Sequence, residues 1–154
     1  MAALALEFAI LTAARSGEVL GAELGEFDLE AKVWTVPAGR MKAGREHRVP
    51  LSDRALQIAT EVGGRFELSS MGMAMLLRRM EVDATVHGFR SSFRDWAGNE
   101  TSFPRDICEA ALAHAVGDAT EAAYRRSDAL EKRRGLMTAW AEYCCELCGT
   151  ITTG

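Results

Sequence analysis

Two short β-forming segments interrupt a chain whose other apolar residues recur at helical spacing. Lys32–Val36 is rich in β-branched and aromatic residues and ends at Pro37, while His47–Leu51 forms a second run. Pro50 lacks a backbone N–H and indicates that this second strand lies at a sheet edge. Since only one such pair occurs, the sequence predicts a mainly α fold with one small antiparallel β-hairpin, an α+β architecture.

The remaining periodicity predicts helices on both sides of the hairpin. Helices are expected over residues 2–14, from Ser16 to Leu24, from Asp53 to about Val62, from Ser69 to Met80, and over 87–98, 104–115, 118–127 and 129–148. Ser16 and Ser52 are the expected N-caps. Two further sets are expected to pack in or around the core: Trp34, Trp96 and Trp140, and Met71, Met73, Met75 and Met80.

Length and composition indicate one soluble globular domain over residues 1–154, with 48% hydrophobic and 26% charged residues. No apolar run approaches the ~20 residues that a membrane span requires. The N-terminal segment has no basic start and contains Glu7, so it is expected to be a core helix and not a signal peptide. We therefore expect a cytoplasmic protein.

The cysteines give a weak signal for metal. Cys145 and Cys148 form one C-x-x-C pair, but no second pair follows, and a zinc site requires four ligands. We expect buried or unreactive thiols, no metal and no cofactor.

Charge is unevenly distributed. The net charge of −4 argues mildly against nucleic-acid binding. Residues 1–31, however, carry six acids and one base, whereas residues 32–54 carry six bases and two acids. The second segment has a net charge of +4 and is therefore a candidate polyanion-binding region.

Six residues suited to phosphate chemistry occur in order along the chain. They are Arg15, Lys42, His87, Arg90, His114 and Tyr124. A planar guanidinium can donate two parallel hydrogen bonds to a phosphate. His87 and Arg90 lie three residues apart in a predicted helix and so share a face.

Each residue taken singly also has a structural interpretation. Arg15 is suited to cap a helix C-terminus, and Lys42 to be a solvated loop charge. His87 fits a helix N-terminal position, His114 a hydrogen-bonded core histidine, and Tyr124 a packing aromatic. Only their joint order and spacing favour a shared site.

The motifs that contain these residues resemble the catalytic domain of the tyrosine recombinases, the phage integrase family, and most closely the integrases of genomic islands and satellite phages. They are TAARSGE with Arg15, MKAGREHRVPLS with Lys42, HGFRSSF with His87 and Arg90, and LAHAVGDATEAAYRRSD with His114 and Tyr124. The resemblance covers nearly the whole chain and implies a DNA breaking-rejoining fold.

The resemblance also implies a reaction that uses neither a metal nor a high-energy cofactor. Tyr124 would attack a DNA phosphodiester and form a 3′-phosphotyrosyl bond, while Arg15 and Arg90 stabilise the phosphate. Lys42 would protonate the leaving 5′-oxygen and His87 would relay the tyrosyl proton. In the same scheme His114 would bind a non-bridging oxygen, and Glu18 would support Arg15. The implied partners are double-stranded DNA at attachment sites and further protomers of the same protein.

Several basic residues outside the six remain open. Arg78 and Arg79 correspond to a family helix that faces DNA. Arg125–Arg126 and Lys132–Arg134 are suited equally to phosphate contacts and to solvated positions.

The sequence departs from the family pattern in two places. The connection Gly63–Leu68 is shorter than usual, and the chain starts directly in the catalytic domain, so we expect a fragment that binds DNA weakly. The C-terminal helix, residues 129–148, is expected to pack either in cis or on a neighbouring protomer. Two alternatives stay open: a type IB topoisomerase-like enzyme, and a non-catalytic DNA-binding or protomer-docking module.

Overall fold

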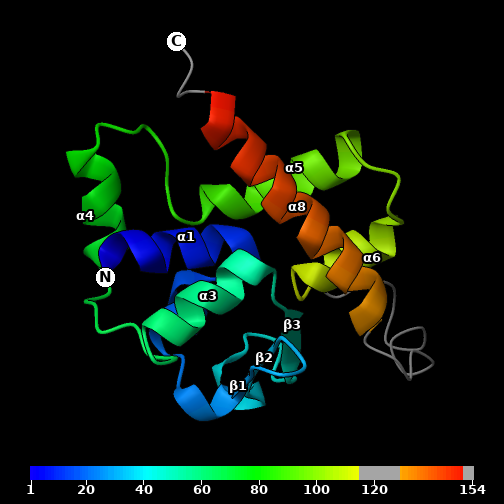
Figure 1. Cartoon of the computed structure of the whole chain (residues 1–154), viewed down its shortest axis with the longest axis horizontal. Coiled ribbons are helices and arrows are strands. Elements are labelled where there is room, and N and C mark those ends of the chain that lie inside the picture. Colours follow the sequence, from blue (N-terminus) through cyan, green and yellow to red (C-terminus); the bar gives the residue numbers. More distant parts are fainter. Residues whose placement is uncertain (115–128, 151–154) are drawn as a thin grey trace.

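The computed structural model describes residues 1–114 and 129–150, with side chains described as far as Leu147. This part of the chain is mostly helical and contains a small antiparallel sheet (Figure 1). The helices are α1 (Ala2–Thr12), α2 (Ser16–Leu20), α3 (Asp53–Glu61), α4 (Gly72–Arg79), α5 (Gly88–Asn99), α6 (Arg105–Ala111) and α8 (Leu130–Thr150). The strands are β1 (Phe27–Asp28), β2 (Val33–Val36) and β3 (His47–Pro50), and two 3-10 turns are η1 (Leu24–Glu26) and η2 (Ala38–Arg40).

The sheet has three strands in the order β1-β2-β3, so the prediction of a two-stranded hairpin was incomplete. The added strand, β1, is only two residues long, too short for an alternating pattern to reveal it. It pairs with β2 because Phe27 stacks on Trp34, with ring centroids 5.7 Å apart. The edge position predicted for Pro50 is confirmed, because β3 pairs with β2 alone.

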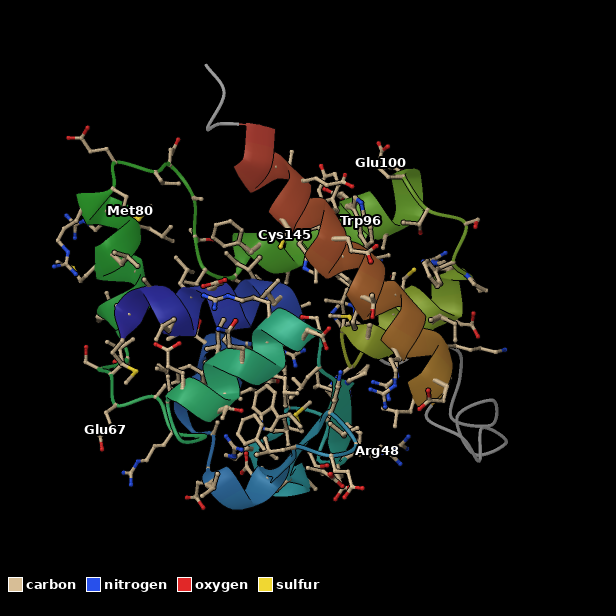
Figure 2. All side chains as sticks on the ribbon, viewed as in Figure 1. Arg48, Glu67, Met80, Trp96, Glu100 and Cys145 are labelled. Carbon is tan, nitrogen blue, oxygen red and sulfur yellow. The ribbon has the colours of Figure 1, made fainter. Side chains whose placement is uncertain are left out.

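The core is divided into two hydrophobic clusters. The first lies among α1, α3, α4 and the sheet and includes Phe8, Trp34 and Ile58. The second lies among α5, α6 and α8 and includes Phe93 and Leu136. Helix α1 lies between the two groups, and α8 crosses α5 close to Trp96 (Figures 1 and 2). The clusters meet at the C-terminal end of α1, and the candidate site lies at this junction.

All three tryptophans pack as predicted, whereas the methionines do not. Met73 is 1% exposed, but Met71, Met75 and Met80 are 57%, 43% and 59% exposed, so the prediction of a methionine core was wrong for three of four. The reason is that α4 is short, lies at the periphery and turns only Met73 and Leu77 inward (Figures 1 and 2).

The helix starts were predicted unevenly. Ser52 caps α3 as expected, with its side chain accepting a hydrogen bond from the Ala55 N–H at 3.3 Å. Arg15, and not Ser16, occupies the N-cap of α2, because the Glu18 side chain closes the first turn onto Arg15. The helix predicted over 118–127 lies outside the described residues.

The short connection after α3 is well packed. Phe66 is buried against Phe8, with ring centroids 5.1 Å apart. Gly64 has a φ of +70°, and a Cβ there would lie 2.7 Å from Cα of Leu24. Among the described helices, none has the length and apolarity needed to cross a membrane.

Candidate functional site

Arg90 projects from α5 into the junction and is only 5% exposed. Its Nη2 donates to the Leu112 carbonyl at 2.8 Å, and its Nη1 donates to the Ala13 carbonyl. Ala13 and Leu112 are the C-caps of α1 and α6, where helix carbonyls carry partial negative charge. A buried guanidinium therefore joins two helix ends. The guanidinium of Arg90 has five N–H donors, and these two carbonyls accept from only two of them.

Arg15 lies close to Arg90 although the two are far apart in sequence. Burial, and after it the positive charge of Arg15, lower the pKa of Arg90 to about 10, while Glu18 opposes the shift. Nη1 of Arg90 donates to the carbonyl of Ala13, two residues before Arg15, so the structure brings the two predicted phosphate-binding arginines to the same end of α1.

Glu18 is the buried anion of this group, at 4% exposure. Its Oε1 accepts a hydrogen bond from Nη1 of Arg15 at 2.7 Å, and its Oε2 accepts from the Arg15 backbone N–H at 2.9 Å. Its backbone carbonyl accepts from Nη1 of Arg40 at 2.9 Å. Glu18 therefore fixes both the start of α2 and the direction of the Arg15 side chain.

The position of the His114 backbone is fixed by the hydrogen bonds that end α6. The Ala113 N–H bonds to the Ala110 carbonyl and the His114 N–H to the Glu109 carbonyl, both at 3.0 Å, with Ala113 at a φ of +54°. This is a Schellman ending, with alanine in place of the usual glycine. His114 is exposed, so the interpretation as a core histidine does not fit.

The imidazole of His114 is held by a carboxylate. Its Nδ1 lies 2.6 Å from Oε2 of Glu109, and Oε1 of Glu109 accepts from Nε of Arg94 at 2.9 Å. Burial alone would raise the pKa of Glu109, but hydrogen bonds from His114 and Arg94 outweigh it and the pKa is lowered. Neither Glu109 nor Arg94 was predicted from the sequence.

Lys42 and His87 are exposed. Lys42 follows Met41, which is buried, in a turn closed by a hydrogen bond from the Gly44 N–H to the Met41 carbonyl at 2.9 Å. Within residues 1–114 and 129–150 its ammonium makes no hydrogen bond or ion pair. His87 is the N-cap of α5, and its carbonyl accepts from the Arg90 N–H at 3.0 Å.

The sequence analysis did not include His47, the one histidine of the chain outside the six candidate residues. It opens β3 opposite Val36. Burial and the positive charge of Arg133 lower its pKa to about 4, with a further contribution from Arg90, while Glu18 and the Ala111 backbone act in the opposite direction. His47 therefore belongs to the same junction. Its place within the motif that contains Lys42 was the available signal.

Within the basic run 132–134, Lys132 is exposed, whereas the two arginines make contacts within the protein. Arg133 is 2% exposed and donates from Nη1 to the Arg48 carbonyl of β3, so it fastens α8 to the sheet. Arg134 pairs with Glu131 at 3.1 Å. Tyr124 and Arg125–Arg126 lie outside the described residues.

Among the described cysteines, Cys108 is buried, Cys144 half-buried and Cys145 exposed. No group of three or more histidine, cysteine or acidic side chains suited to a metal occurs among the residues with described positions.

Comparison with known proteins agrees with the motifs. Residues 1–70 match the model of the phage integrase family. The chain is 39% identical over 150 residues to prophage integrase IntA of Escherichia coli (strain K12), an alignment covering 86% of this chain and 36% of that protein. It is 30% identical over 175 residues to the integrase of Enterobacteria phage P4, covering 93% of this chain and 40% of that protein.

A third relative, the integrase of Shigella phage Sf6, is 28% identical over 153 residues, covering 88% of this chain and 40% of that protein. The chain thus spans between 36% and 40% of the length of these relatives. No solved structure matches it. The family model and the named integrases together confirm the recognition made from the motifs: the chain is a relative of the phage integrases.

Proposed function

We propose that the chain is the catalytic part of a site-specific DNA recombinase with the tyrosine recombinase fold. The observation that carries this proposal is that buried Arg90 bonds to the carbonyl of Ala13, two residues before Arg15, while the buried carboxylate of Glu18 fixes the Arg15 side chain. Two guanidinium groups that share one region are suited to bind a phosphodiester with both non-bridging oxygens engaged. The integrases named above support the same assignment.

In the proposed reaction the Tyr124 oxygen attacks the scissile phosphorus and the bond from phosphorus to the 5′-oxygen breaks. The tyrosyl proton passes to His87, and Lys42 donates a proton to the leaving 5′-oxygen. The DNA remains attached as a 3′-phosphotyrosyl ester until the 5′-hydroxyl of a partner strand reverses the step. An ordinary phenol, with a pKa of about 10, is only about one part in a thousand ionised at neutral pH, so proton removal is required.

The arginines and His114 supply charge stabilisation. Negative charge grows on the non-bridging oxygens in the transition state, where Arg15, Arg90 and His114 would donate. Loss of one preorganised donor of this kind costs on the order of 3 kcal/mol, or 10²–10³ in rate.

The exposed residues Lys42 and His87 are proposed to contact the DNA when it binds. Lys42 stands on a turn anchored by Met41, and bound DNA would draw its ammonium toward the leaving 5′-oxygen. Double-stranded DNA at attachment sites and further protomers are the proposed partners. Leu147 and Tyr143, exposed on α8, are available for a protomer contact. The proposed setting is a bacterial cytoplasm, with the gene carried by the bacterium or a phage.

The test uses the whole chain and a pool of nicked duplexes with randomised sequence around the nick, at low salt. We expect SDS-resistant protein–DNA adducts whose attachment maps to Tyr124 by mass spectrometry. Tyr124→Phe should abolish them. Tyr143→Phe is the matched control, because the only other tyrosine packs on Trp96 and Trp140 with ring centroids 5.6 and 5.7 Å away.

The outcomes separate the alternatives. Adducts that persist in Tyr124→Phe would show that the nucleophile is misassigned. Relaxation of supercoiled plasmid without a specific site would favour the type IB topoisomerase-like activity. Binding with no adduct, even from a longer chain that includes the preceding region of the relatives, would favour a non-catalytic module.

A further inference from the structure

The mostly buried carboxylate of Glu109 contacts His114, a proposed phosphate-binding residue. The Glu109 side chain is 11% exposed, whereas that of His114 is 37% exposed. The two meet at 2.6 Å between Oε2 and Nδ1. The mostly buried Glu109 carboxylate therefore fixes the partly exposed imidazole ring of His114.

The direction of this hydrogen bond follows from the state of the carboxylate. Arg94 contacts Oε1 of Glu109 with both Nε, at 2.9 Å, and Nη2, at 2.8 Å. This ion pair and the lowered pKa keep Glu109 ionised at neutral pH. An ionised carboxylate can only accept hydrogen bonds, so Nδ1 of His114 must be the donor.

This bond determines what the other ring nitrogen can do. With Nδ1 committed to Glu109, Nε2 on the opposite side of the ring is left for an external partner. When the ring is protonated, Nε2 also carries a hydrogen, and Glu109 supplies the counter-charge. A protonated ring held in this way can donate from Nε2 to an anion without first reorienting, whereas in the neutral ring Nε2 can only accept.

We propose that Glu109 is a positioning residue for DNA cleavage, which presents the Nε2–H of the protonated His114 ring to a non-bridging oxygen of the scissile phosphate. Arg94 holds Glu109 in the orientation required. This inference rests on the proposed function, because it takes the ligand of His114 to be a DNA phosphate.

The first test needs no activity. In the ¹⁵N-labelled whole chain at neutral pH, we expect imidazole correlations that place a proton on Nδ1 of His114, with the signal assigned by its loss in His114→Gln. Glu109→Gln should shift or remove the hydrogen-bonded Nδ1–H signal. Arg94→Gln, at a more exposed position, should shift it less. A wild-type spectrum with Nδ1 of His114 unprotonated would overturn the inference, whether or not Glu109→Gln folds.

The second test measures adduct formation in a single turnover on the nicked-duplex pool. In Glu109→Gln the rate at saturating DNA should fall about 10- to 100-fold, the range seen when carboxylate partners of metal-binding histidines are removed. The apparent affinity for DNA should change less than about threefold, since a positioning role acts on the reacting geometry. Asp95→Asn, which removes an exposed acid beside Arg94, should leave both values unchanged.

A wild-type rate in Glu109→Gln would overturn the proposal, and so would a loss confined to DNA affinity. If neither the wild-type chain nor the longer chain forms an adduct, the proposed function fails, and the imidazole spectrum still decides whether Glu109 positions His114.

Discussion

The inner and outer parts of the candidate site are built differently. The inner part, Glu18, His47 and Arg90, is held by contacts between α2, the sheet, α5 and the ends of α1 and α6. The outer part, Lys42 and His87, is exposed. His114 lies between them, since its ring is partly exposed but anchored at one nitrogen. Folding alone therefore assembles the inner part, and the outer residues stay available to a ligand.

This contrast predicts that inner substitutions lower stability and outer ones do not. Arg90→Met should have the largest effect, because the Ala13 and Leu112 carbonyls would lose a charged donor inside the protein. We expect the free energy of unfolding to fall by about 3–5 kcal/mol, measured by urea denaturation. Arg79→Met, on the exposed face of α4, should change it by less than about 0.5 kcal/mol. Equal stability of the two variants would contradict the assignment of Arg90 to the inner part.

His47 should give the inner part a pH dependence. Its pKa is about 4 in the folded chain and 6.5 in the unfolded reference, so the unfolded chain binds more protons between these values. Stability is therefore complete above pH ~6.5 and is lost as pH falls toward ~4, by up to about 3 kcal/mol.

The measurement is the free energy of unfolding at a series of pH values from 7 to 4.5. His47→Gln should flatten the profile, whereas His87→Gln, at an exposed position, should retain the wild-type slope. A profile unaffected by His47→Gln would mean that another group titrates in this range.

Glu18→Gln should have a smaller effect. The substitution keeps the shape of the side chain but weakens its bonds to Arg15 and leaves two neighbouring arginines without their anion. We expect a loss of about 1–2 kcal/mol in unfolding free energy. Glu23→Gln, an exposed acid of the same region, serves as the control and should have almost no effect. A stabilised Glu18→Gln would argue against a structural role for the carboxylate.

Lys42→Ala should have the smallest effect on stability and a large one on activity. The ammonium makes no ion pair within the described part of the chain, so unfolding should change by less than about 0.5 kcal/mol. If Lys42 donates a proton to the leaving oxygen, adduct formation on a nicked duplex should slow by about 10²–10⁴. Arg45→Ala, in the same loop, is the comparison. Similar rates for the two variants would remove Lys42 from the proposed mechanism.

Several local features were predictable because short-range chemistry produces them. The β-branched run of β2 and the edge proline of β3 gave the strands, and Ser52 gave the start of α3 three residues before its hydrogen-bond partner. The N-cap of α2 was misplaced by one residue, because the Glu18 side chain closes that turn and the residue type of Ser16 did not decide it. The exposed methionines of α4 were mispredicted because helical periodicity shows a face and not whether anything covers it.

The sequence by itself determined the residue types, their order and the local elements, and these were sufficient to recognise a phage integrase relative. Only the tertiary structure decided that Arg90 joins the ends of α1 and α6, that His47 enters the same junction, and that Arg133 is buried against β3. These contacts join segments far apart in the chain. They follow from the packing of the two hydrophobic clusters around α1, and no periodicity or spacing within a single segment encodes that packing.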